Sequence, residues 1–434
     1  MLTHRTATLI GDIPEGWSRE SLFHLLVDQE GGDWGQDDGE VGIRVLRSTN
    51  FTNGGTLSFA DVAVRYFTEA KATNMELKVN DLLLERSGGG PTQPVGRIGF
   101  ITDDLPGHWF SNFVQLLRPD AKKIDPEFLG WVLLRVNQSG VVERLQHQTT
   151  QMRNLDFRDY LRVYLPKPKP EEQRQISAAL RNATNALAGA EAKLCAARQL
   201  KSALMQKLFT QGVPGRHAQM NETRVGTVPA MWAVARIQSV LDGMPFNGVS
   251  PQSRPEPPGT PILNVECIED GICSTKHVSY VDVDENTQEE CRARKGDFYV
   301  IRGNGNRDYV AAGGLLLREP EVPTIFSDKL IRLRFQTSKV VERFVPYLWQ
   351  SSAFLRRIQS KAECGSGLWM MGKRDIRREL FAYPTDLNEQ SEMVELVDAA
   401  IENIAACERE VLALRRVKHS LLQNLLTGRV RVRG

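Results

Sequence analysis

The sequence has few cysteines, and none of them lies in the paired spacing of a metal-binding motif. Its six cysteines are scattered along the chain without a C-x2-C pair, which argues against a structural zinc site. Cys267, Cys273 and His277 lie close together, but their spacing matches no common zinc pattern. We therefore expect ordinary thiols, no metal ion and no cofactor.

Long hydrophobic runs are also missing. No apolar stretch reaches the roughly 18 residues that a membrane-spanning helix needs, and the start Met1-Leu-Thr-His-Arg5 lacks the layout of a signal peptide. We therefore expect a cytoplasmic protein without a membrane partner. A hydrophobic fraction of 41% is nevertheless ample for buried cores, and the length of 434 residues suits several domains.

An excess of charge of one sign is absent as well. The formal net charge of +2 neither requires nor excludes a nucleic-acid partner, so any phosphate contact must come from local positive charge. Such charge is present between Arg356 and Arg378, where seven basic residues face only two acidic ones, and the tail beyond residue 428 adds further arginines. Residues 28–40 are acidic and should face away from phosphate.

Catalytic motifs are missing too. The chain has no nucleophile elbow and no His-Glu-x-x-His motif. The segment from Gly367 to Arg374 imitates a phosphate loop, but Arg374 stands where the magnesium-binding Ser or Thr belongs. The Asn/Asp-Pro-Pro-Phe/Tyr motif, which an adenine methyltransferase uses for its target base, is not present either. We expect no catalytic residue in this chain.

The chain instead carries one pattern twice. The segment Gly11–Trp17 returns as Gly226–Trp232, and Lys201–Thr210 returns as Lys418–Thr427. The spacing between the two copies of each segment is far too long for a solenoid, whose repeats run roughly 20–50 residues. It indicates two copies of a whole module, and therefore a molecule with pseudo-two-fold symmetry. B-DNA also has a local dyad, so a duplicated reader suits it.

Two segments, Glu171–Thr210 and Asn388–Thr427, place apolar residues in strict steps of four and three. This spacing is typical of a coiled-coil helix, and each helix would extend roughly 60 Å. Lys201 and Lys418 interrupt the two seams at equivalent positions; they either extend to water or contact a phosphate or a partner protein. The seam residues are Ile176, Leu180, Leu187, Leu194 and Leu204 in the first helix, and Met393, Val397, Ile404, Val411 and Leu421 in the second.

A lone helix with such a seam would expose it, so each helix needs a partner. Packing on its own globular domain is one solution, but the sustained heptads favour the two helices packing on each other. We expect an antiparallel coiled coil, since this orientation suits two DNA half-sites about 34–36 Å apart. A symmetric register would place the dyad near Ala190 and Cys407.

The rest of the chain is mixed in character. Short β-rich runs such as Asp297–Arg302 alternate with turns and with helical stretches such as Pro126–Arg135. We therefore predict an α+β fold with two tandem mixed α/β domains, each followed by a long helix. The predicted segments are 1–165 (first globular domain), 166–212 (first helix), 213–385 (linker and second globular domain) and 386–434 (second helix and basic tail).

These features resemble the DNA-specificity subunit of type I restriction–modification systems, over essentially the whole chain. The resemblance is carried by the helix starts Pro170–Ile176 and Leu387–Met393, and by the helix ends Leu204–Thr210 and Leu421–Gly428. The openings Ile13–Trp17 and Val228–Trp232, and the turns Arg86–Gly90 and Arg302–Asn306, are equally typical of that family.

The resemblance implies that each globular part is a target-recognition domain that reads one half of a bipartite double-stranded DNA site. The two helices would act as a ruler that sets the spacer between the halves. Two modification subunits would dock to form an adenine-N6 methyltransferase, and two restriction subunits can join to add ATP-dependent translocation and cleavage. The chain itself would be a non-catalytic subunit.

Base reading requires side chains with paired donors and acceptors on turns that enter a groove. The turn Arg302–Arg307 offers two arginines for guanine and two asparagines for adenine, although Asn and Gly also serve plain strand connections by adopting positive φ. The amide-rich run 146–153 and its counterpart 361–374 are either readers or solvated loops. The candidate DNA-binding residues are Arg86, Ser87, Arg97, Gln148, Thr149, Gln151 and Arg153 in the first copy, and Arg302, Asn304, Asn306, Arg307, Lys361, Lys373 and Arg374 in the second.

Two other interpretations stay open at this point. One is a coiled-coil adaptor that joins protein partners without reading DNA, and the other is a methyltransferase or nuclease whose catalytic residues are not recognisable. Failure to bind duplex DNA in the presence of modification subunits would favour the adaptor, and methyl transfer by the purified chain would favour the enzyme. The bases read and the spacer length do not follow from the sequence.

Overall fold

The computed structural model describes residues 7–8, 11–89, 94–148, 152–365 and 367–432. The chain forms two compact units: unit 1 consists of Met1–Glu191 and Arg409–Gly434, and unit 2 is Ala192–Glu408. Both long helices cross from one unit into the other. Each unit therefore combines pieces that the predicted division into four segments keeps apart.

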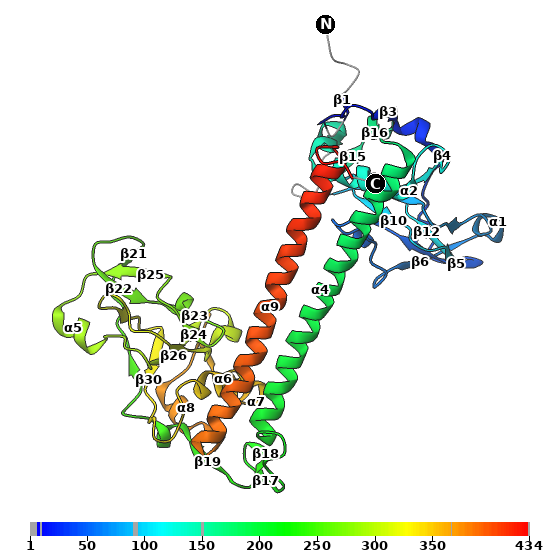
Figure 1. Ribbon diagram of the computed structural model, residues 1–434. Helices are drawn as coiled ribbons and strands as arrows, with labels where there is room; N and C mark the ends of the chain where they lie inside the picture. The colour runs from blue at the N-terminus through cyan, green and yellow to red at the C-terminus, as the bar shows by residue number, and fades with distance from the viewer. Residues whose placement is uncertain (1–6, 9–10, 90–93, 149–151, 366, 433–434) are drawn as a thin grey trace. The chain divides into compact units, whose positions relative to one another are not determined.

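The long helices are α4 (Pro170–Gln211) and α9 (Leu387–Leu425), drawn in green and orange-red in Figure 1. The heptad spacing predicts both, and their seams are the least exposed faces. Buried seam residues are Ile176, Leu180, Met393, Val397 and Val411; half-buried ones are Leu187, Leu194, Leu204, Ile404 and Leu421. The seam therefore packs as the apolar periodicity predicts.

The two helices run antiparallel, and the buried clusters of each unit show it. In unit 1, Leu180 near the start of α4 shares a cluster with Leu425 at the end of α9. In unit 2, Leu208 near the end of α4 shares a cluster with Val397 near the start of α9. Only opposite chain directions bring the start of one helix to the end of the other in both units.

Ion pairs between the helices show the register. Arg415 Nη2 lies 2.7 Å from Glu191 Oε1 in unit 1, and Arg198 Nη2 lies 2.7 Å from Glu408 Oε1 in unit 2. One heptad forward on α4 thus corresponds to one heptad back on α9. All four side chains are partly exposed, so the pairs contribute little stability, about 0–1 kcal/mol each.

The centre of this register differs from the expected one. Glu191 and Glu408 are equivalent in the repeat that aligns Lys201 with Lys418, and so are Arg198 and Arg415, so the two ion pairs are equivalent as well. Their midpoint falls near Leu194 and Val411, about one helical turn beyond the predicted centre. The expectation of a dyad near Ala190 and Cys407 was wrong, because an apolar seam alone repeats every heptad and does not select one register.

The core of unit 1 is an antiparallel sheet of order β10-β8-β13-β4, covered by helix α2 (Pro126–Gln138). Asp125 caps α2, since its Oδ1 accepts from the Phe128 amide at 2.7 Å, and Pro126 begins the helix. Gly130 permits close packing, because a Cβ there would lie 2.4 Å from the Phe100 ring. The sheet strands are β4 (Leu26–Gly31), β8 (Leu82–Glu85), β10 (Ile98–Phe100) and β13 (Val114–Pro119).

A second sheet of unit 1 has the order β12-β5-β6, and a third has the order β14-β15-β9. Their strands are β5 (Val41–Leu46), β6 (Ala63–Phe67), β12 (His108–Phe110), β9 (Ser87–Gly88), β14 (Gln146–Gln148) and β15 (Arg153–Leu155). The smaller elements are β1 (Ala7–Thr8), β2 (Gly11–Asp12), β3 (Ser18–Ser21), β7 (Glu76–Leu77), β11 (Leu105–Pro106), β16 (Tyr164–Lys167), α1 (Glu69–Ala72) and α3 (Phe157–Leu161).

Unit 2 repeats this plan around a six-stranded sheet of order β20-β30-β26-β28-β24-β23. Its strands are β20 (Phe246–Asn247), β23 (Ile268–Glu269), β24 (Ile272–Cys273), β26 (Phe298–Ile301), β28 (Gly313–Leu316) and β30 (Leu330–Leu333). A four-stranded sheet of order β21-β25-β22-β29 comprises β21 (Ser253–Arg254), β22 (Thr260–Leu263), β25 (Val278–Val281) and β29 (Ile325–Phe326).

A three-stranded sheet of order β27-β32-β31 and several short elements complete unit 2. The strands are β27 (Gly303–Asn304), β31 (Glu363–Gly365), β32 (Leu368–Met370), β17 (Met220–Thr223), β18 (Gly226–Pro229), β19 (Trp232–Arg236) and β33 (Leu380–Pro384). The helices are α5 (Glu285–Glu290), α6 (Phe344–Gln350), α7 (Ser352–Gln359) and α8 (Lys373–Arg378).

Equivalent ion pairs mark the duplication inside the two cores. Asp81, 1% exposed, accepts from Arg118 Nε at 2.7 Å in unit 1. Asp297, also 1% exposed, accepts from Arg334 Nε at 2.5 Å in unit 2. The two aspartates occupy matching positions of the repeat, as do the two arginines, so the units share interior chemistry as well as strand order.

One pair has its charges exchanged between the units. In unit 1, Glu127 of α2 accepts from Arg181 of α4 at 2.5 Å, and burial raises the pKa of the Glu127 carboxyl while the arginine opposes that rise. In unit 2, the equivalent positions hold Arg343 and Asp398, paired at 2.8 Å. In each unit an ion pair therefore joins the globular part to the helix that follows it, but the acidic and basic partners are exchanged between the units.

None of the helices in the described part of the chain combines the length and the apolar content that a membrane crossing requires.

Candidate DNA-recognition interface

In unit 1, the small sheet β14-β15-β9 joins the two segments that residue types single out as DNA readers. Arg153 of β15 pairs with Gly88 of β9, and Asn154 pairs with Ser87. The turn after Arg86 and the amide-rich run therefore lie side by side, although they are far apart in the sequence. Gln148 pairs with Arg153 across the hairpin, whereas Thr149 and Gln151 lie outside the described residues. We call β9, β14 and β15 the unit 1 hairpin sheet.

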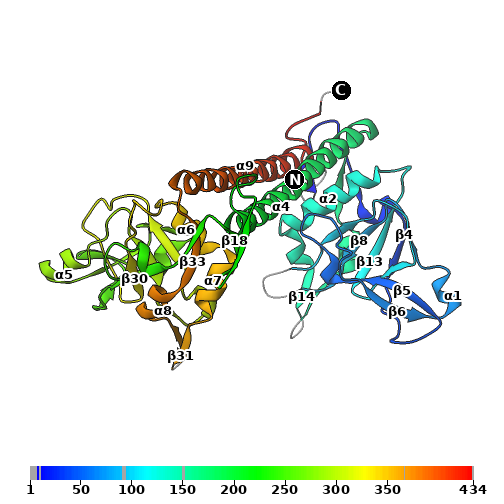
Figure 2. The same cartoon turned by 90° about the horizontal axis from the view of Figure 1, so that it is seen from below.

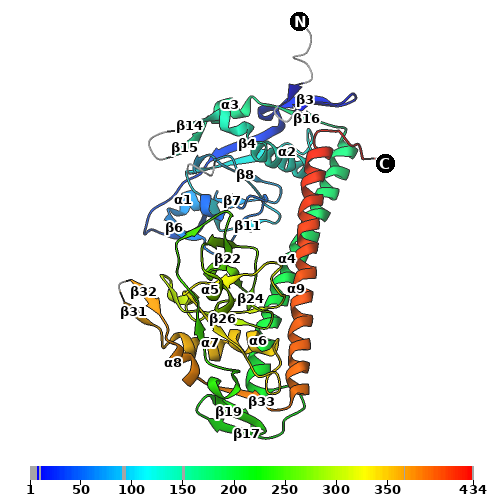
Figure 3. The same cartoon turned by 90° about the vertical axis from the view of Figure 1, so that its left-hand side faces the viewer.

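In unit 2, the sheet β27-β32-β31 does the same. Gly303 and Asn304 of β27 pair with Met370 and Trp369 of β32, so the turn that begins at Arg302 lies against the basic segment. Strands β31 and β32 protrude from the body of unit 2 (Figure 2, Figure 3). We call these three strands the unit 2 hairpin sheet.

The two hairpin sheets share strand order and register but present different side chains. Gly88 of unit 1 and Asn304 of unit 2 occupy matching positions of the repeat. Their cross-strand partners are also equivalent, and these are Arg153 and Trp369 respectively. A common scaffold with different side chains is what reading two different DNA half-sites requires.

The asparagines of the unit 2 turn shape its backbone. Asn304 Oδ1 accepts from the Asn306 amide at 2.9 Å, and Asn306 Oδ1 accepts from the Asp308 amide at 3.0 Å. These hydrogen bonds are typical of Asx turns. The side-chain oxygens are thus engaged with the backbone, and the amide nitrogens remain to donate. Neither Gly303 nor Gly305 adopts a positive φ, so these glycines do not give the turn a left-handed backbone.

The arginines of this turn are better placed to read a base. Arg302 is half-buried and Arg307 is exposed. Within the described part of the chain, neither guanidinium forms an ion pair or a hydrogen bond, and that of Arg307 lies over the Trp369 ring with its carbon 4.9 Å from the ring centroid. Arginine is the side chain that most often reads guanine, through O6 and N7 in the major groove.

Known proteins match nearly the whole chain. The putative type I restriction enzyme MjaX specificity subunit of Methanocaldococcus jannaschii is 23% identical over 98% of this chain and 96% of its own length. The MjaVIII specificity subunit of the same organism is 24% identical over 84% of this chain and 83% of its own. The StySPI specificity subunit of Salmonella potsdam is 21% identical over 96% and 89%. No family model matches the sequence.

This chain resembles type I restriction specificity subunits over nearly its whole length. Solved structures agree in fold. A chain from a type I R-M system, studied for complex assembly and conformational transition, has a TM-score of 0.59 at 17% identity, covering 96% of this chain and all of its own length. The S subunit of M. genitalium has a TM-score of 0.54 at 14% identity, over 96% and 99%.

One predicted DNA-binding residue has a structural role in unit 1. Arg97 is buried, and it donates to both carboxylate oxygens of Glu85 at 2.7 and 2.8 Å and to the carbonyls of Ser48 and Phe51. These four bonds hold its guanidinium inside unit 1 and give it a structural role, so a contact of Arg97 with DNA stays a prediction. Ser87 is also largely buried, at 9% exposure, while the half-buried Arg86 donates to Gln115 at 3.2 Å.

In the basic segment of unit 2, one predicted DNA-binding residue is likewise held by the fold, and two others are exposed. Lys361 is ion-paired with Glu379, a carboxylate at 3% exposure that also accepts from Arg357 Nε at 2.8 Å. Lys361 is therefore occupied in neutralising a buried charge. Lys373 and Arg374, at the start of α8, are exposed, and among the described residues they form no ion pair. They remain available for phosphate contacts.

The glutamates at the helix starts could be singled out from the sequence only through the family resemblance. In unit 1, Glu172 accepts from the indole of Trp17 at 3.0 Å and from Arg431 at 2.5 and 2.8 Å. The glutamate thereby ties the opening of the globular part, the start of α4 and the tail after α9 together. Its burial, at 9% exposure, makes these partners necessary.

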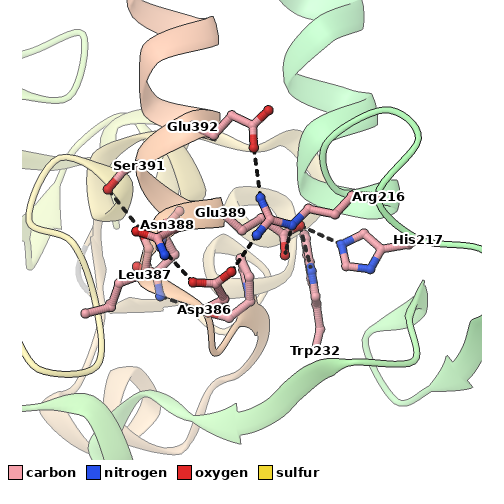
Figure 4. A network of polar contacts seen from close by, with 11 residues as sticks. Arg216, His217, Trp232, Asp386, Leu387, Asn388, Glu389, Ser391 and Glu392 are labelled. Carbon is pink, nitrogen blue, oxygen red and sulfur yellow. Dashed lines mark hydrogen bonds and ion pairs between the residues drawn. The ribbon is translucent and has the colours of Figure 1, made fainter.

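Figure 4 shows the equivalent network in unit 2. Glu389 accepts from the Trp232 indole at 3.2 Å and from His217 at 2.6 Å, and it lies 3.9 Å from Arg216. Arg216 also reaches Asp386 and Glu392. The repeated Trp and Glu of the family pattern thus have one structural role in both units.

The glutamines that follow these glutamates order the connection into each helix. Gln173 Oε1 accepts from the Asp125 amide at 2.7 Å, and its amide donates to the Pro168 carbonyl. Gln390 Oε1 accepts from the Val341 amide at 2.8 Å, and its amide donates to the Pro384 carbonyl. Each glutamine therefore satisfies backbone groups on both sides of the domain–helix junction.

Other predicted features have simple structural explanations. Lys418 lies 5.6 Å from the Trp131 ring centroid, and burial lowers the pKa of its ammonium. Cys267 and Cys273 are buried, and the Cys267 thiol donates to the His277 carbonyl. In the described ranges, no three His, Cys, Asp or Glu side chains gather as they would around a metal ion.

Proposed function

We propose that this chain is a type I restriction specificity subunit that reads a bipartite duplex DNA site, with one hairpin sheet addressing each half. The observation that carries the proposal is that the same small sheet recurs in both units. In each unit it joins two distant segments whose residue types suit base reading. A two-stranded ribbon fits the major groove, where each base pair has a distinct pattern of donors and acceptors.

The local charge of the hairpin sheets supports this assignment. Lys373 and Arg374 of unit 2 lie just beyond β32 and are exposed. They suit phosphate contacts, which position a protein on the duplex without reading sequence. Arg302 and Arg307 lie on the adjacent turn, where their guanidinium groups suit base edges. The unit thus offers both classes of contact within one surface segment.

We further propose that α4 and α9 act as the ruler between the two half-sites. Their antiparallel pairing gives each unit the start of one helix and the end of the other, so both units are held in the same way. A helix of 42 residues extends roughly 60 Å, which is enough to separate two half-sites by one helical turn of DNA or more.

The partners follow from the same assignment. Two modification subunits would dock on the specificity subunit and methylate adenine N6, and two restriction subunits would join in complexes that also cleave. The chain itself would carry no catalytic centre and would supply the sequence specificity of the complex, and we expect it to work in the cytoplasm. Methyl transfer by the purified chain alone would contradict this role.

The experiment is to express the chain with its neighbouring modification subunit in a host without other adenine-N6 methylation, and to map N6-methyladenine. We expect one bipartite motif with a fixed spacer. Methylation without a motif, or failure to form a complex that binds duplex DNA, would contradict the proposal and favour a protein adaptor. The modification subunit expressed alone is the control, and it should leave no motif.

A further inference from the structure

The turn after β27 holds one arginine in a fixed position on the surface of unit 2. The guanidinium of Arg307 stacks over the indole of Trp369, with 4.9 Å from its carbon to the ring centroid. Trp369 belongs to β32 and is paired with Asn304 of β27. The stacking therefore links the turn to the protruding hairpin, and it engages the face of the guanidinium while leaving its N–H edges free to donate.

The backbone beneath this arginine is held on several sides. The Gln359 side chain donates to the carbonyls of Asp308 and Val310 at 2.8 and 3.1 Å. The Trp349 indole donates to the Ala311 carbonyl at 2.7 Å, and the Met371 amide donates to the Arg302 carbonyl at 2.8 Å. These bonds fix both ends of the turn, so its side chains lose little further freedom on binding.

The charge of Arg307 is not neutralised within the unit. Among the described residues it forms no ion pair, although Asp308 is its neighbour in sequence. Lys361 in the same region is paired with a buried carboxylate. An exposed, stacked and unpaired guanidinium is thus prepared for an outside acceptor, and its planar pair of donors matches two acceptors in one plane.

We propose that Arg307, held by Trp369, reads a guanine in the half-site addressed by unit 2. Guanine offers O6 and N7 on its major-groove edge, and arginine bonds both at once. Trp369 is the positioning residue, since it orients the guanidinium without contacting the base. The unit 1 hairpin sheet carries Arg153 at the position of Trp369, so this device belongs to unit 2 alone. The inference rests on the proposed function.

The test compares methylation motifs of the intact complex with those of single variants. Arg307→Ala and Arg307→Lys should both turn one guanine position of one half-site degenerate, with discrimination at that position falling roughly 10- to 100-fold. Lysine keeps the charge but loses the planar pair of donors, so it separates base reading from simple phosphate attraction. Trp369→Leu should relax the same position more weakly.

Two controls make the outcome decisive. Arg318→Ala removes an exposed arginine of the same unit outside the hairpin sheet and should leave the motif unchanged. The half-site read by unit 1 reports folding and assembly within each variant, because it should stay intact throughout. Retention of every guanine in Arg307→Ala, or a uniform decrease over all sites, would overturn the inference. A parent complex without any motif would instead contradict the proposed function.

Discussion

The ion pair between Glu85 and Arg97 provides a direct test of the structural assignment. The Glu85 side chain is fully buried and the Arg97 side chain is 11% exposed. The arginine bridges β8, through Glu85, to the loop that contains Ser48 and Phe51. Replacing Arg97 by Ala would leave a buried carboxylate without its partner and two carbonyls without a donor.

The stability lost on replacing Arg97 by Ala follows from that geometry. Removing one member of a buried ion pair typically costs about 3–5 kcal/mol, because the remaining charge stays desolvated. The equivalent of Glu85 in unit 2 is Ile301, which is buried at 2% exposure, so the fold tolerates an apolar side chain there. We therefore expect the double variant Glu85→Met with Arg97→Met to be more stable than Arg97→Ala. Coupled pairs deviate from additivity by about 0.5–3 kcal/mol.

The chain has two compact units, so a single unfolding midpoint would mix them. Hydrogen exchange with mass spectrometry resolves them. In Arg97→Ala, the amides of β8 and β10 should exchange faster by about two to four orders of magnitude, as expected for about 3–5 kcal/mol. Strand β26 of unit 2 should be unaffected and serves as the internal control. Arg86→Ala, which removes a single hydrogen bond to Gln115, should cost only about 1 kcal/mol.

The reasoning would be refuted by the opposite pattern. If Arg97→Ala kept native protection in β8 and β10 but changed the bases of one half-site, Arg97 would be a DNA reader after all. If the double variant were no more stable than the single variant, the buried carboxylate would not be the source of the cost.

Three further predictions concern other parts of the molecule. Arg181→Asp should repel Glu127 and destabilise unit 1 by about 1 kcal/mol, which faster hydrogen exchange in α2 and at the start of α4 would report. Adding Glu127→Arg should restore the exchange rates of the parent, and no rescue would exclude the pairing. Arg431→Met should expose the start of α4 to faster hydrogen exchange, because Glu172 loses its cation, whereas Arg431→Lys should retain part of the protection; equal exchange in both variants would contradict this role. Hydrogen bonding from the Thr287 amide lowers the pKa of Asp284, so the Asp284 cap on α5 stabilises the fold above about pH 4, and this contribution is lost as pH falls through the lowered pKa. The variant Asp284→Asn should therefore lose less thermal stability than the parent between about pH 5 and 3. Equal slopes of stability against pH would argue against the assignment.

The long helices and the duplication could be predicted because their signals are local. The heptad spacing of α4 and α9 depends on neighbouring turns of one helix, and it identified seam residues such as Leu180 and Val397 that are buried. The register could not be predicted, since a seven-residue repeat fits several alignments. The ion pair between Glu191 and Arg415 and the equivalent pair in the repeat show which of these alignments the structure has.

The roles of individual polar residues depended on contacts between distant segments. Arg97 and Arg307 are both arginines near glycine-rich turns, and composition treats them alike. One meets a buried carboxylate and becomes structural, whereas the other stacks on an indole at the surface. The same holds for Asn304, whose side-chain oxygen is engaged by a backbone amide two residues further on.

Periodicity and repetition are properties of the covalent order, so they were sufficient to predict a duplicated chain of globular domains and long paired helices. Which side chains face outward from the hairpin sheets was settled by folding instead. Strand pairing brings Ser87 to Asn154 and Asn304 to Trp369, although each pair joins segments that lie far apart in the chain. Burial and hydrogen-bond satisfaction at such contacts are set by the folded packing, and no local pattern encodes them.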